Sequence, residues 1–459
     1  MVAEVGALGK HIALVGFMGA GKSTIGREVA ARIRRPFVDT DEQIEQQFGP
    51  IPELFERGEA EFRRIEEQVV AEALAGPPAV LALGGGAVLS ARTRERLRAN
   101  AFGVLVEIDA EEAWRRSRGS DRPLARDEQD FRRLYEERRP LYAQVADATA
   151  GEAGGVLLAA LGIRLEHGGR PAVDGAVALV ADERVLELHP FELDGATLTL
   201  PPGEQAKTLG VVERLLEELQ LGRDGTIVGF GGGSTTDVAG FVAATYLRGV
   251  AWIAVPTTLV GQVDAAIGGK TGINLGHGKN LVGAFHFPEA VVIDPEVLAT
   301  LPDEEGRAGM AEVVKTGLLA GSDVWSLPEE EMIRACAAFK AGVVLSDPYE
   351  REGRRAILNL GHTFAHALEA GSGFTVRHGD AVALGLLAAL RLSGRPTEVV
   401  EDLLRPQPAP ADADAAWAAL KRDKKGEGVF VLLEGPGKPV VTTVPDSDAR
   451  AALNALIRQ

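Results

Sequence analysis

The sequence predicts an α/β protein whose last part, from about residue 299, is all-helical. Two patterns carry this prediction. Short apolar runs at residues 11–15 and 226–230 lead directly into glycine-rich loops, and a helix-like segment follows each loop. This succession of strand, loop and helix is typical of parallel sheets, whose strands are buried on both faces. Beyond residue 299 the apolar residues recur at helical spacing instead.

Length and composition limit the class of protein. A chain of 459 residues predicts about three domains. The single cysteine, Cys336, excludes a disulfide framework and indicates a reducing compartment. The net charge of −17 disfavours a carrier of nucleic acid, and no apolar run is long enough to span a bilayer. With no signal-peptide pattern at the N-terminus, we expect a cytoplasmic protein that acts on small molecules.

The first glycine loop matches the pattern GxxxxGK[ST], with Gly16, Gly21, Lys22 and Ser23 in register. Its backbone N–H groups and the following helix suit a triphosphate, because both present positive partial charge. Lys22 would reach the phosphates and the Ser23 hydroxyl would bind Mg²⁺. The alternative, a plain turn between strand and helix, is disfavoured by the full match. The predicted ATP contacts are Gly19, Ala20, Gly21, Lys22, Ser23 and Thr24.

Further polar positions follow along the first part of the chain. Asp39 and Asp41 end a second strand, where one could serve Mg²⁺ and the other a substrate hydroxyl, or both could simply be polar residues at a strand end. Arg63 lies three residues before Glu66 on the same helix face. The alternative to a functional role is that these two residues form a solvated ion pair. The strand at 80–83 ends in three glycines, against which a ligand can press.

Basic residues close this first part. Residues 115–122 are rich in arginine and precede a proline, which suits a cationic lid for phosphoryl transfer. Taken together, residues 10 to about 162 resemble shikimate kinase. The resemblance implies that Asp39 joins the metal shell through water and that Arg122 closes over the transferring phosphate. It implies that shikimate is held by Asp41, Arg63, Gly85 and Arg138, the arginines forming a fork for its carboxylate.

The second part has the strand and loop pattern of an open α/β sheet, at whose edge a dinucleotide could bind. A strand at 177–181 ends in Asp182, which could hold an adenosine ribose or cap a helix. The strand at 226–230 leads into Gly231-Gly232-Gly233-Ser234, with Asp237 beyond it. This is not GxGxxG, although a triple-glycine turn that opens a helix can still seat a pyrophosphate.

The segment 262–280 is rich in glycine and lysine and suits an anionic, phosphorylated substrate. Its Gly269-Lys270-Thr271 suggests a second triphosphate loop, but Asp264 stands where the first glycine of that pattern is required. We therefore reject a second loop of that kind.

A candidate metal site appears in the helical part. His362 and His366 lie four residues apart and share a helix face, and His378 follows about a dozen residues later. Two histidines form half of a metal site and need a carboxylate from elsewhere. Upstream, Glu312 shares a helix face with Lys315 among apolar neighbours, where charges are costly unless paired or bound to metal. The alternative is three hydrogen-bonded histidines of the core.

The motifs GEQxK, GGGS with Asp237, QVDxxxGGKTG, AEVVK and LNLGHTFxHA occur in that order, and residues 170–459 resemble 3-dehydroquinate synthase. The resemblance implies Zn²⁺, or Co²⁺, held by Glu312, His362 and His378, and it moves His366 to the substrate phosphate. It implies NAD⁺ contacts at Asp182, Glu204, Lys207, Gly231, Gly232, Gly233, Ser234, Asp237, Thr257, Thr258, Lys270 and Lys279. It implies substrate contacts at Asp264, Lys270, Lys279, Asn280, Lys315, Lys340, Arg355, Asn359, His366 and one of Lys424 and Lys425.

The same resemblance implies a homodimer in which Arg248 reaches the neighbouring subunit's site. Asp380 and Ala365 depart from the usual family residues, but neither is a predicted ligand. We predict a P-loop kinase domain at 1–165, an NAD-binding α/β domain at 172–298 and a helical domain for metal and substrate at 299–459. The chain would phosphorylate shikimate and convert 3-deoxy-D-arabino-heptulosonate 7-phosphate to 3-dehydroquinate. Three alternatives are a regulatory ATP-binding domain in front of a synthase, a different sugar-phosphate cyclase and a non-enzymatic scaffold.

Overall fold

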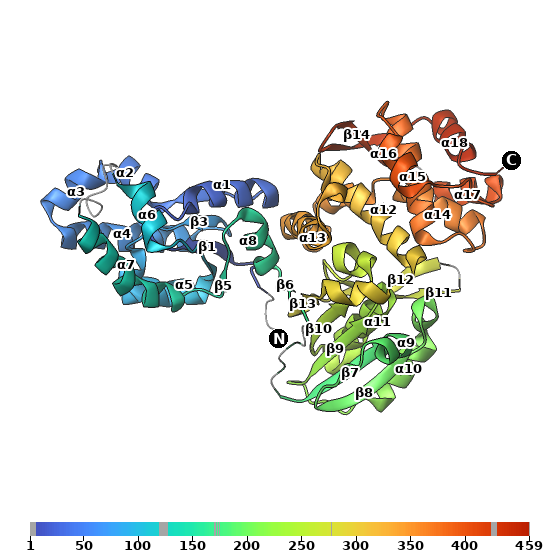
Figure 1. Cartoon of the computed structure of the whole chain (residues 1–459), viewed down its shortest axis with the longest axis horizontal. Helices are drawn as coiled ribbons and strands as arrows, with labels where there is room; N and C mark the ends of the chain where they lie inside the picture. The colour runs from blue at the N-terminus through green and yellow to red at the C-terminus, as the bar shows by residue number, and fades with distance from the viewer. Residues whose placement is uncertain are drawn as a thin grey trace. The chain divides into compact units, whose positions relative to one another are not determined.

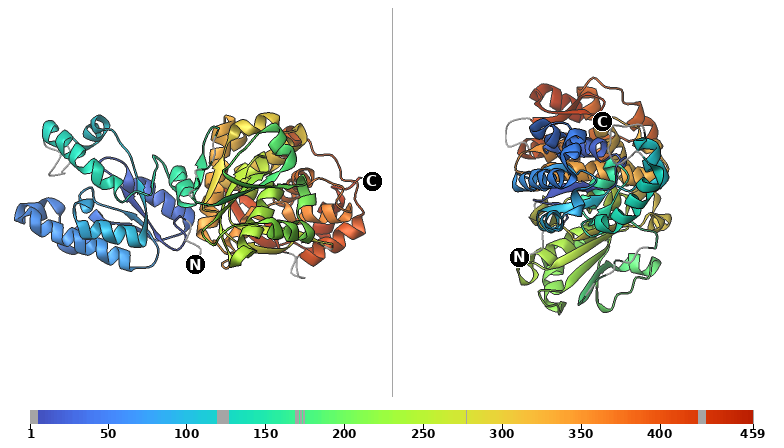
Figure 2. Two further views of the ribbon diagram at one scale, coloured as in Figure 1. Left: turned by 90° about the horizontal axis from the view of Figure 1, so that it is seen from below. Right: turned by 90° about the vertical axis from the view of Figure 1, so that its left-hand side faces the viewer.

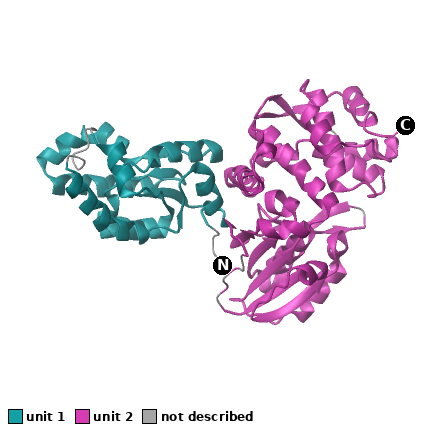
Figure 3. Cartoon of the chain, viewed as in Figure 1, with its two compact units in different colours: residues 1, 3–163 teal, residues 2, 164–459 magenta. Residues whose placement is uncertain are grey.

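The computed structural model describes residues 6–118, 127–168, 171, 173, 175–276, 278–423 and 429–458. The chain divides into two compact units between Ile163 and Arg164 (Figure 3). Each unit is built on its own sheet (Figure 1). Among the described residues, no helix has the length and apolar character needed to cross a membrane.

The first unit contains a parallel five-stranded sheet in the order β2-β3-β1-β4-β5. Its strands are β1 (His11–Val15), β2 (Phe37–Asp39), β3 (Val80–Ala82), β4 (Ala101–Leu105) and β5 (Ala148–Thr149). β1 is fully buried, as its apolar run predicts. Because β2 and β3 lie on one side of β1 and β4 lies on the other, the loop after β1 sits where the strand order reverses, which is where α/β sheets bind ligands.

Helices cover both faces of this sheet (Figures 1 and 2). They are α1 (Lys22–Ile33), α2 (Thr40–Phe48), α3 (Ile51–Arg57), α4 (Glu59–Ala75), α5 (Ala91–Asn100), α6 (Ala110–Ser117), α7 (Glu128–Ala143) and α8 (Ala153–Ala160), with the short 3₁₀ helix η1 (Ala87–Leu89). The loop before α1 requires glycine at its first position. Gly16 has φ +145°, and a Cβ there would lie 2.5 Å from the carbonyl oxygen of Val106.

The second unit begins with a six-stranded sheet in the order β6-β13-β10-β9-β7-β8, parallel from β13 to β8. Its strands are β6 (Ile163–Leu165), β7 (Val177–Asp182), β8 (Gly195–Leu200), β9 (Thr226–Gly231), β10 (Ala251–Pro256) and β13 (Ala290–Ile293). Around it lie α9 (Glu183–Leu188), η2 (Gly203–Ala206), α10 (Leu209–Glu218), α11 (Gly233–Thr245), η3 (Tyr246–Arg248), η4 (Gly261–Ala265) and η5 (Pro295–Thr300). The strand order reverses between β7 and β9, so their carboxyl ends form the expected ligand edge.

An antiparallel hairpin of β11 (Lys270–Leu275) and β12 (Gly278–Phe285) interrupts this sheet in sequence. The rest of the unit is a helical lobe. Its helices are α12 (Asp303–Ala320), η6 (Val324–Ser326), α13 (Glu329–Ser346), η7 (Arg354–Asn359), α14 (His362–Gly371), α15 (His378–Leu392), α16 (Glu398–Leu404), α17 (Ala413–Asp423) and α18 (Asp446–Asn454). The α/β and helical classes predicted from the sequence are confirmed, with one addition to the all-helical region.

That addition is a second antiparallel hairpin, β14 (Val429–Gly435) with β15 (Lys438–Thr443). It packs against α15, and the Phe430 ring lies 5.2 Å from the ring of Phe364 in the lobe core. The β-branched and aromatic run at 429–433 explains the strand, since such residues favour extended backbone on a half-buried surface.

Candidate functional sites

The glycine loop of the first unit presents an open helix end. Gly21 precedes α1 with φ +90° and provides no side-chain cap, so this helix end can present backbone N–H groups to a phosphate. Lys22 Nζ donates to the carbonyl oxygens of Gly16 and Phe17, at 2.9 and 3.1 Å, and so lies across the loop. Three other predicted ATP contacts lie next to this lysine in sequence, namely Gly19 and Ala20 of the loop and Thr24 of the helix.

The two groups predicted to bind Mg²⁺ lie together. Ser23 Oγ donates to Asp39 Oδ2 at 2.5 Å. The other oxygen of Asp39 accepts from the backbone N–H groups of Asp41 and Glu42, which caps α2. The carboxylate is therefore fixed from two sides, and the hydroxyl and carboxylate that suit a hard cation are adjacent.

The predicted shikimate residues surround the glycines after β3. A Cβ on Gly84 would lie 2.3 Å from Asp41 Oδ1, and one on Gly86 would lie 2.0 Å from Arg63 Nη1. Arg138 Nη1 donates to the Gly85 carbonyl at 3.2 Å. Only glycine allows both side chains to approach this close, so residues from α2, α4 and α7 converge on one backbone segment.

Buried charge is concentrated around this segment. Arg63 Nη1 donates to Glu66 Oε2 at 2.7 Å, and burial raises the pKa of Glu66. Arg138 is 3% exposed, and its Nε forms no hydrogen bond among the described residues. Tyr142 Oη also donates to the Gly85 carbonyl, and burial raises the pKa of Tyr142 to about 12. A carboxylate ligand would supply an acceptor for Nε of Arg138.

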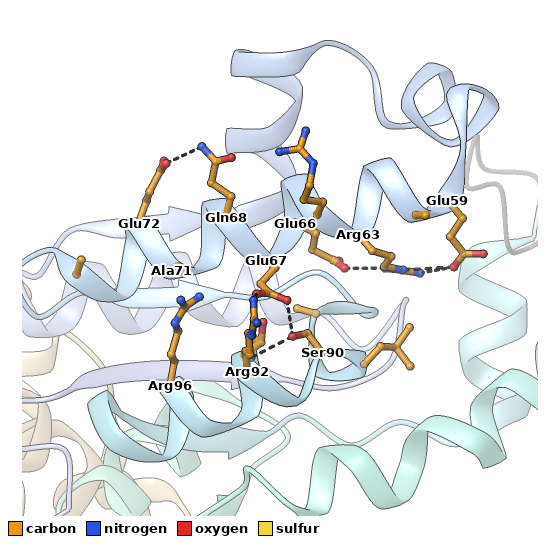
Figure 4. A pocket seen from close by; sticks show the side chains of 16 residues that line it. Glu59, Arg63, Glu66, Glu67, Gln68, Ala71, Glu72, Ser90, Arg92 and Arg96 are labelled. Carbon is orange, nitrogen blue, oxygen red and sulfur yellow. Dashed lines mark hydrogen bonds and ion pairs between the residues drawn. The ribbon is translucent and has the colours of Figure 1, made fainter.

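A groove of about 1020 Å³ lies beside this site, between α4 and α5 (Figure 4). Arg63 and Glu66 line one end of it, but neither Asp41 nor Arg138 does. The groove therefore borders the predicted shikimate position without containing it. Arg122, the predicted lid residue, falls outside the described residues.

In the second unit, the predicted NAD⁺ residues gather at the open end of α11. Gly232 precedes the helix without a side-chain cap. Lys207, which is 3% exposed, places Nζ 2.6 Å from Asp237 Oδ2 and also contacts Asn280 of the β12 strand. Burial raises the pKa of Asp237. Glu204 accepts from Ser234 Oγ at 3.3 Å.

Threonines from the end of β10 complete this edge. The Thr257 N–H donates to the carbonyl of Gly231 at 2.9 Å, and the buried Thr257 hydroxyl has no hydrogen-bond partner among the described residues. The Thr258 methyl lies 3.0 Å from the Cβ position of Gly232. Asp182 ends β7 at the same edge, where it caps α9 through the N–H groups of Arg184 and Val185. Glycines 231–233, with the open hydroxyl of Thr257, leave a polar cradle suited to a pyrophosphate.

A buried cluster of charges lies between the sheet and the helical lobe. Lys340 Nζ donates to the backbone carbonyl of Asp264 at 2.6 Å and contacts its carboxylate, which also lies 3.4 Å from Lys315 Nζ. Burial opposes ionisation of Asp264, but the two ammonium groups lower its pKa. For Lys315 burial is outweighed by Asp264 and Glu312, which raise its pKa, whereas burial lowers the pKa of Lys340.

Two further cations, the exposed Lys270 and the buried Arg355, lie around one carboxylate. Glu350 contacts Lys270 and lies 3.6 Å from Arg355 Nε. Arg355 is held by the carbonyls of Gly268 and Pro348. Asn359 is exposed at the end of η7, and Arg248 is exposed on η3. Lys424 and Lys425 fall outside the described residues.

The three predicted metal ligands converge. His362 Nε2 lies 3.4 Å from Glu312 Oε1, and His378 Nε2 lies 3.6 Å from the same oxygen. One ligand atom from each residue lies within 4.8 Å of the others. Glu312 is 1% exposed, and neither of its oxygens forms a hydrogen bond among the described residues, although Lys315 also contacts it. A buried carboxylate that faces two imidazole nitrogens through one oxygen and an ammonium group through the other has the ligand types that suit a metal ion.

The backbone orients one of these rings. His362 Nδ1 lies 3.2 Å from the carbonyl of Leu360, which directs Nε2 toward Glu312. His366 is exposed, with its ring 5.7 Å from that of His362, so it borders the site without joining the three ligand atoms.

Sequence reasoning missed Glu369. This carboxylate is 3% exposed, lies 3.5 Å from His378 Nδ1 and 2.8 Å from Lys279 Nζ. Burial opposes its ionisation, but His378 and Lys279 lower the pKa of Glu369 to about 2. Its spacing could have identified it as a candidate, because Glu369 shares a helix face with His362 inside an otherwise apolar stretch of α14.

The two units therefore define two classes of site. The first is a P-loop nucleotide site beside an arginine-lined pocket, and the second is a dinucleotide-type sheet edge beside a three-ligand metal site. Family models assign the same division: shikimate kinase at residues 18–156, the 3-dehydroquinate synthase N-terminal domain at 197–308 and its C-terminal domain at 309–425.

Individual relatives agree with the family models. The chain is 40% identical over 321 residues to the 3-dehydroquinate synthase of Salinibacter ruber, covering 61% of this chain and 87% of the relative. It is 40% identical over 349 residues to that of Saccharopolyspora erythraea, covering 69% of this chain and 92% of the relative. The structure of 2-epi-5-epi-valiolone synthase from Streptomyces hygroscopicus, with NAD⁺ and Zn²⁺ bound, matches with a TM-score of 0.59 at 25% identity, covering 64% of this chain and 96% of that one.

The chain thus belongs to the 3-dehydroquinate synthase family and carries a shikimate kinase domain in front of its synthase domains. Both resemblances predicted from the sequence are confirmed. The protein is an enzyme of the shikimate pathway, with a kinase part and a lyase part.

Proposed function

We propose that this one chain carries out two reactions of the shikimate pathway. The first unit transfers the γ-phosphoryl group of ATP to the 3-hydroxyl of shikimate. The second converts 3-deoxy-D-arabino-heptulosonate 7-phosphate to 3-dehydroquinate and phosphate. The convergence of Glu312, His362 and His378 beside the Asp264–Lys315–Lys340 cluster supports the second reaction most directly.

In the first unit, the loop N–H groups and Lys22 would hold the phosphates, and Ser23 with Asp39 would hold Mg²⁺. Arg63 and Arg138 would bind the shikimate carboxylate as a fork, because both guanidinium groups face the glycine segment. Asp41 would accept a hydrogen bond from a substrate hydroxyl. Positioning and neutralisation of charge would then provide most of the rate enhancement.

In the second unit, NAD⁺ would be held by the open end of α11 together with Lys207 and Asp237. When bound, NAD⁺ would take up and return a hydride, and Zn²⁺ or Co²⁺ held by Glu312, His362 and His378 would polarise substrate hydroxyls. Lys315 and Lys340 would bind anionic groups of the substrate and keep Asp264 ionised. Lys270 and Arg355, now paired with Glu350, would be available to the phosphate.

We further propose that the synthase part forms a homodimer, in which the exposed Arg248 approaches the partner's site, and that the enzyme works in the cytoplasm. The buried free thiol of Cys336 fits a reducing compartment. Light scattering of the purified chain tests the dimer: a mass near 48.4 kDa would contradict it.

Product analysis tests the two activities. The purified chain, with Zn²⁺, NAD⁺ and the heptulosonate phosphate, is expected to release phosphate and 3-dehydroquinate in equal amounts. With Mg²⁺ and ATP, it should release ADP only when shikimate is present. ADP release independent of shikimate would favour a regulatory ATP-binding domain.

A different sugar-phosphate cyclase is the second candidate, because the chain also matches the structure of 2-epi-5-epi-valiolone synthase. Turnover of neutral sugar phosphates in preference to the acidic heptulosonate phosphate would favour it. The same assay therefore separates the two.

A further inference from the structure

Glu369 lies where three elements of the second unit meet. It belongs to α14, and its Oε1 lies 3.5 Å from Nδ1 of His378, the first residue of α15. The same oxygen accepts a hydrogen bond of 2.8 Å from Lys279 Nζ on the β12 strand. One buried oxygen thus links a metal-ligand helix, a second helix and the hairpin.

The burial of Glu369 needs these partners. The carboxylate is 3% exposed, and its neighbours Ala365, Ala367 and Leu368 are buried apolar residues. A carboxylate in such surroundings is costly unless positive or hydrogen-bonding groups compensate it. Both groups that compensate Glu369 belong to the predicted metal and NAD⁺ sites.

The two histidine ligands differ in how they are held. His362 is 9% exposed, and a backbone carbonyl lies next to its Nδ1. His378 opens its helix, and 41% of its side chain is exposed. Its ring therefore has less support from packing, and Glu369 is the group that faces its Nδ1.

We propose that Glu369 is a positioning residue for the metal site. It accepts a hydrogen bond from the Nδ1–H of His378, holds the ring so that Nε2 faces Glu312 and thereby raises the affinity for the metal ion. A carboxylate that orients a metal-bound histidine in this way typically contributes 10- to 100-fold in affinity. The proposal rests on the metal site of the proposed function, and it adds a residue that lies outside the ligand set.

Lys279 allows this role to be separated from a general loss of contacts. Replacing Lys279 removes the other partner of Glu369 but leaves the contact to His378 in place. Asp380 provides a matched control for charge: it is an exposed carboxylate two residues beyond His378 on the same helix. D380N removes one negative charge near the metal without touching Nδ1.

The experiment is a titration of the metal-free full-length chain with Co²⁺, in competition with a chromophoric chelator and with the visible absorption of bound Co²⁺ recorded. E369Q is expected to weaken Co²⁺ binding by about 10- to 100-fold and to alter the absorption bands. D380N should match the unsubstituted chain. K279M should stay within about threefold of it, because the contact between Glu369 and His378 is left in place. Far-ultraviolet circular dichroism checks that each variant is folded.

Unchanged affinity and bands in E369Q would overturn the proposal, as would an equal loss in D380N, which would assign the effect to charge alone. If E369Q does not fold, E369D is measured in its place. A folded E369D with undiminished affinity for Co²⁺ would overturn the proposal, and a tenfold loss of that affinity would support it. Failure of the unsubstituted chain to bind Co²⁺ would instead refute the metal site of the proposed function.

Discussion

The Nε2 atom of His362, at the first residue of α14, lies 3.4 Å from a carboxylate oxygen of Glu312 in the second half of α12. Both residues are buried, and Lys315 contacts the same carboxylate from one turn further along α12. The negative charge of Glu312 is thus placed where a cation can be bound between two helices. From this placement we predict that the proposed synthase reaction depends on a metal ion.

Removal of the metal should therefore affect one activity and spare the other. Treating the chain with a zinc-selective chelator, too dilute to bind Mg²⁺, is expected to abolish phosphate release from the heptulosonate phosphate. The shikimate-dependent release of ADP should not change, because Ser23 and Asp39 suit Mg²⁺ with oxygen atoms only. Added Zn²⁺ should restore the lost activity. Survival of both activities would contradict the assignment of Glu312, His362 and His378.

The ion pair between Lys207 and Asp237 should govern NAD⁺ binding. K207M is expected to raise the Kd for NAD⁺ at least about tenfold and to lower the free energy of unfolding by about 1–3 kcal/mol, because the largely buried Asp237 loses its partner. Isothermal titration and urea unfolding measure the two effects. In the double variant K207M/D237N, stability should partly recover while NAD⁺ binding stays weak. Recovery of both would mean that the pair serves stability alone.

Arg63 should act on shikimate and not on ATP. R63A is expected to raise the KM for shikimate by about 10- to 100-fold, since a charge-assisted hydrogen bond to a carboxylate is lost. R63K should recover only part of this loss, because an ammonium group lacks the planar fork. Steady-state kinetics with each substrate varied provide the comparison. The matched control is R64A, which removes the exposed neighbouring arginine; an equal effect there would assign the change to overall charge.

His11 should make the first unit less stable in mild acid. The ring is 4% exposed on β1, its Nδ1 accepts the Ala79 N–H at 3.1 Å, and burial lowers its pKa in the folded chain. Below the unfolded value of about 6.5, the unfolded chain binds more protons than the folded one. The stabilisation that the neutral, buried His11 provides is therefore complete above that pH. It is lost as the pH falls toward the pKa that His11 has in the folded chain.

Through His11 alone, the free energy of unfolding can change by up to about 1.4 kcal/mol per pH unit. Urea unfolding of the first unit between pH 5 and 8 measures it. H11N keeps an acceptor near Ala79 but cannot titrate, so its stability should depend less on pH in this range. An identical pH profile for H11N would show that other groups account for the acid sensitivity.

Short-range patterns predicted much of both sites. The loop that holds Lys22 and Ser23 depends on glycines within a few residues, and the shared helix face of His362 and His366 depends on local spacing alone. Such features are fixed by backbone geometry and do not need knowledge of the fold. The family resemblances then supplied Glu312, which the structure places beside His362 and His378.

Contacts between distant segments were not accessible in the same way. The pairing of Glu369 with Lys279 joins α14 to the β12 strand, and no periodicity in the sequence connects them. The β14–β15 hairpin was missed because its apolar run at 429–433 is also compatible with a buried helix. Asp182 had two interpretations, and the structure shows that it caps α9, while its contact with NAD⁺ stays a prediction.

The most direct test of the account is a crossover of two single variants in both assays. K22M removes the phosphate-binding ammonium of the first unit, and E312Q removes the carboxylate ligand of the second. We predict that K22M loses shikimate phosphorylation by more than about 100-fold while its synthase rate is unchanged, and that E312Q shows the reverse. If either variant loses both activities while remaining folded, or if either keeps both, then two separate active sites in one chain would be contradicted.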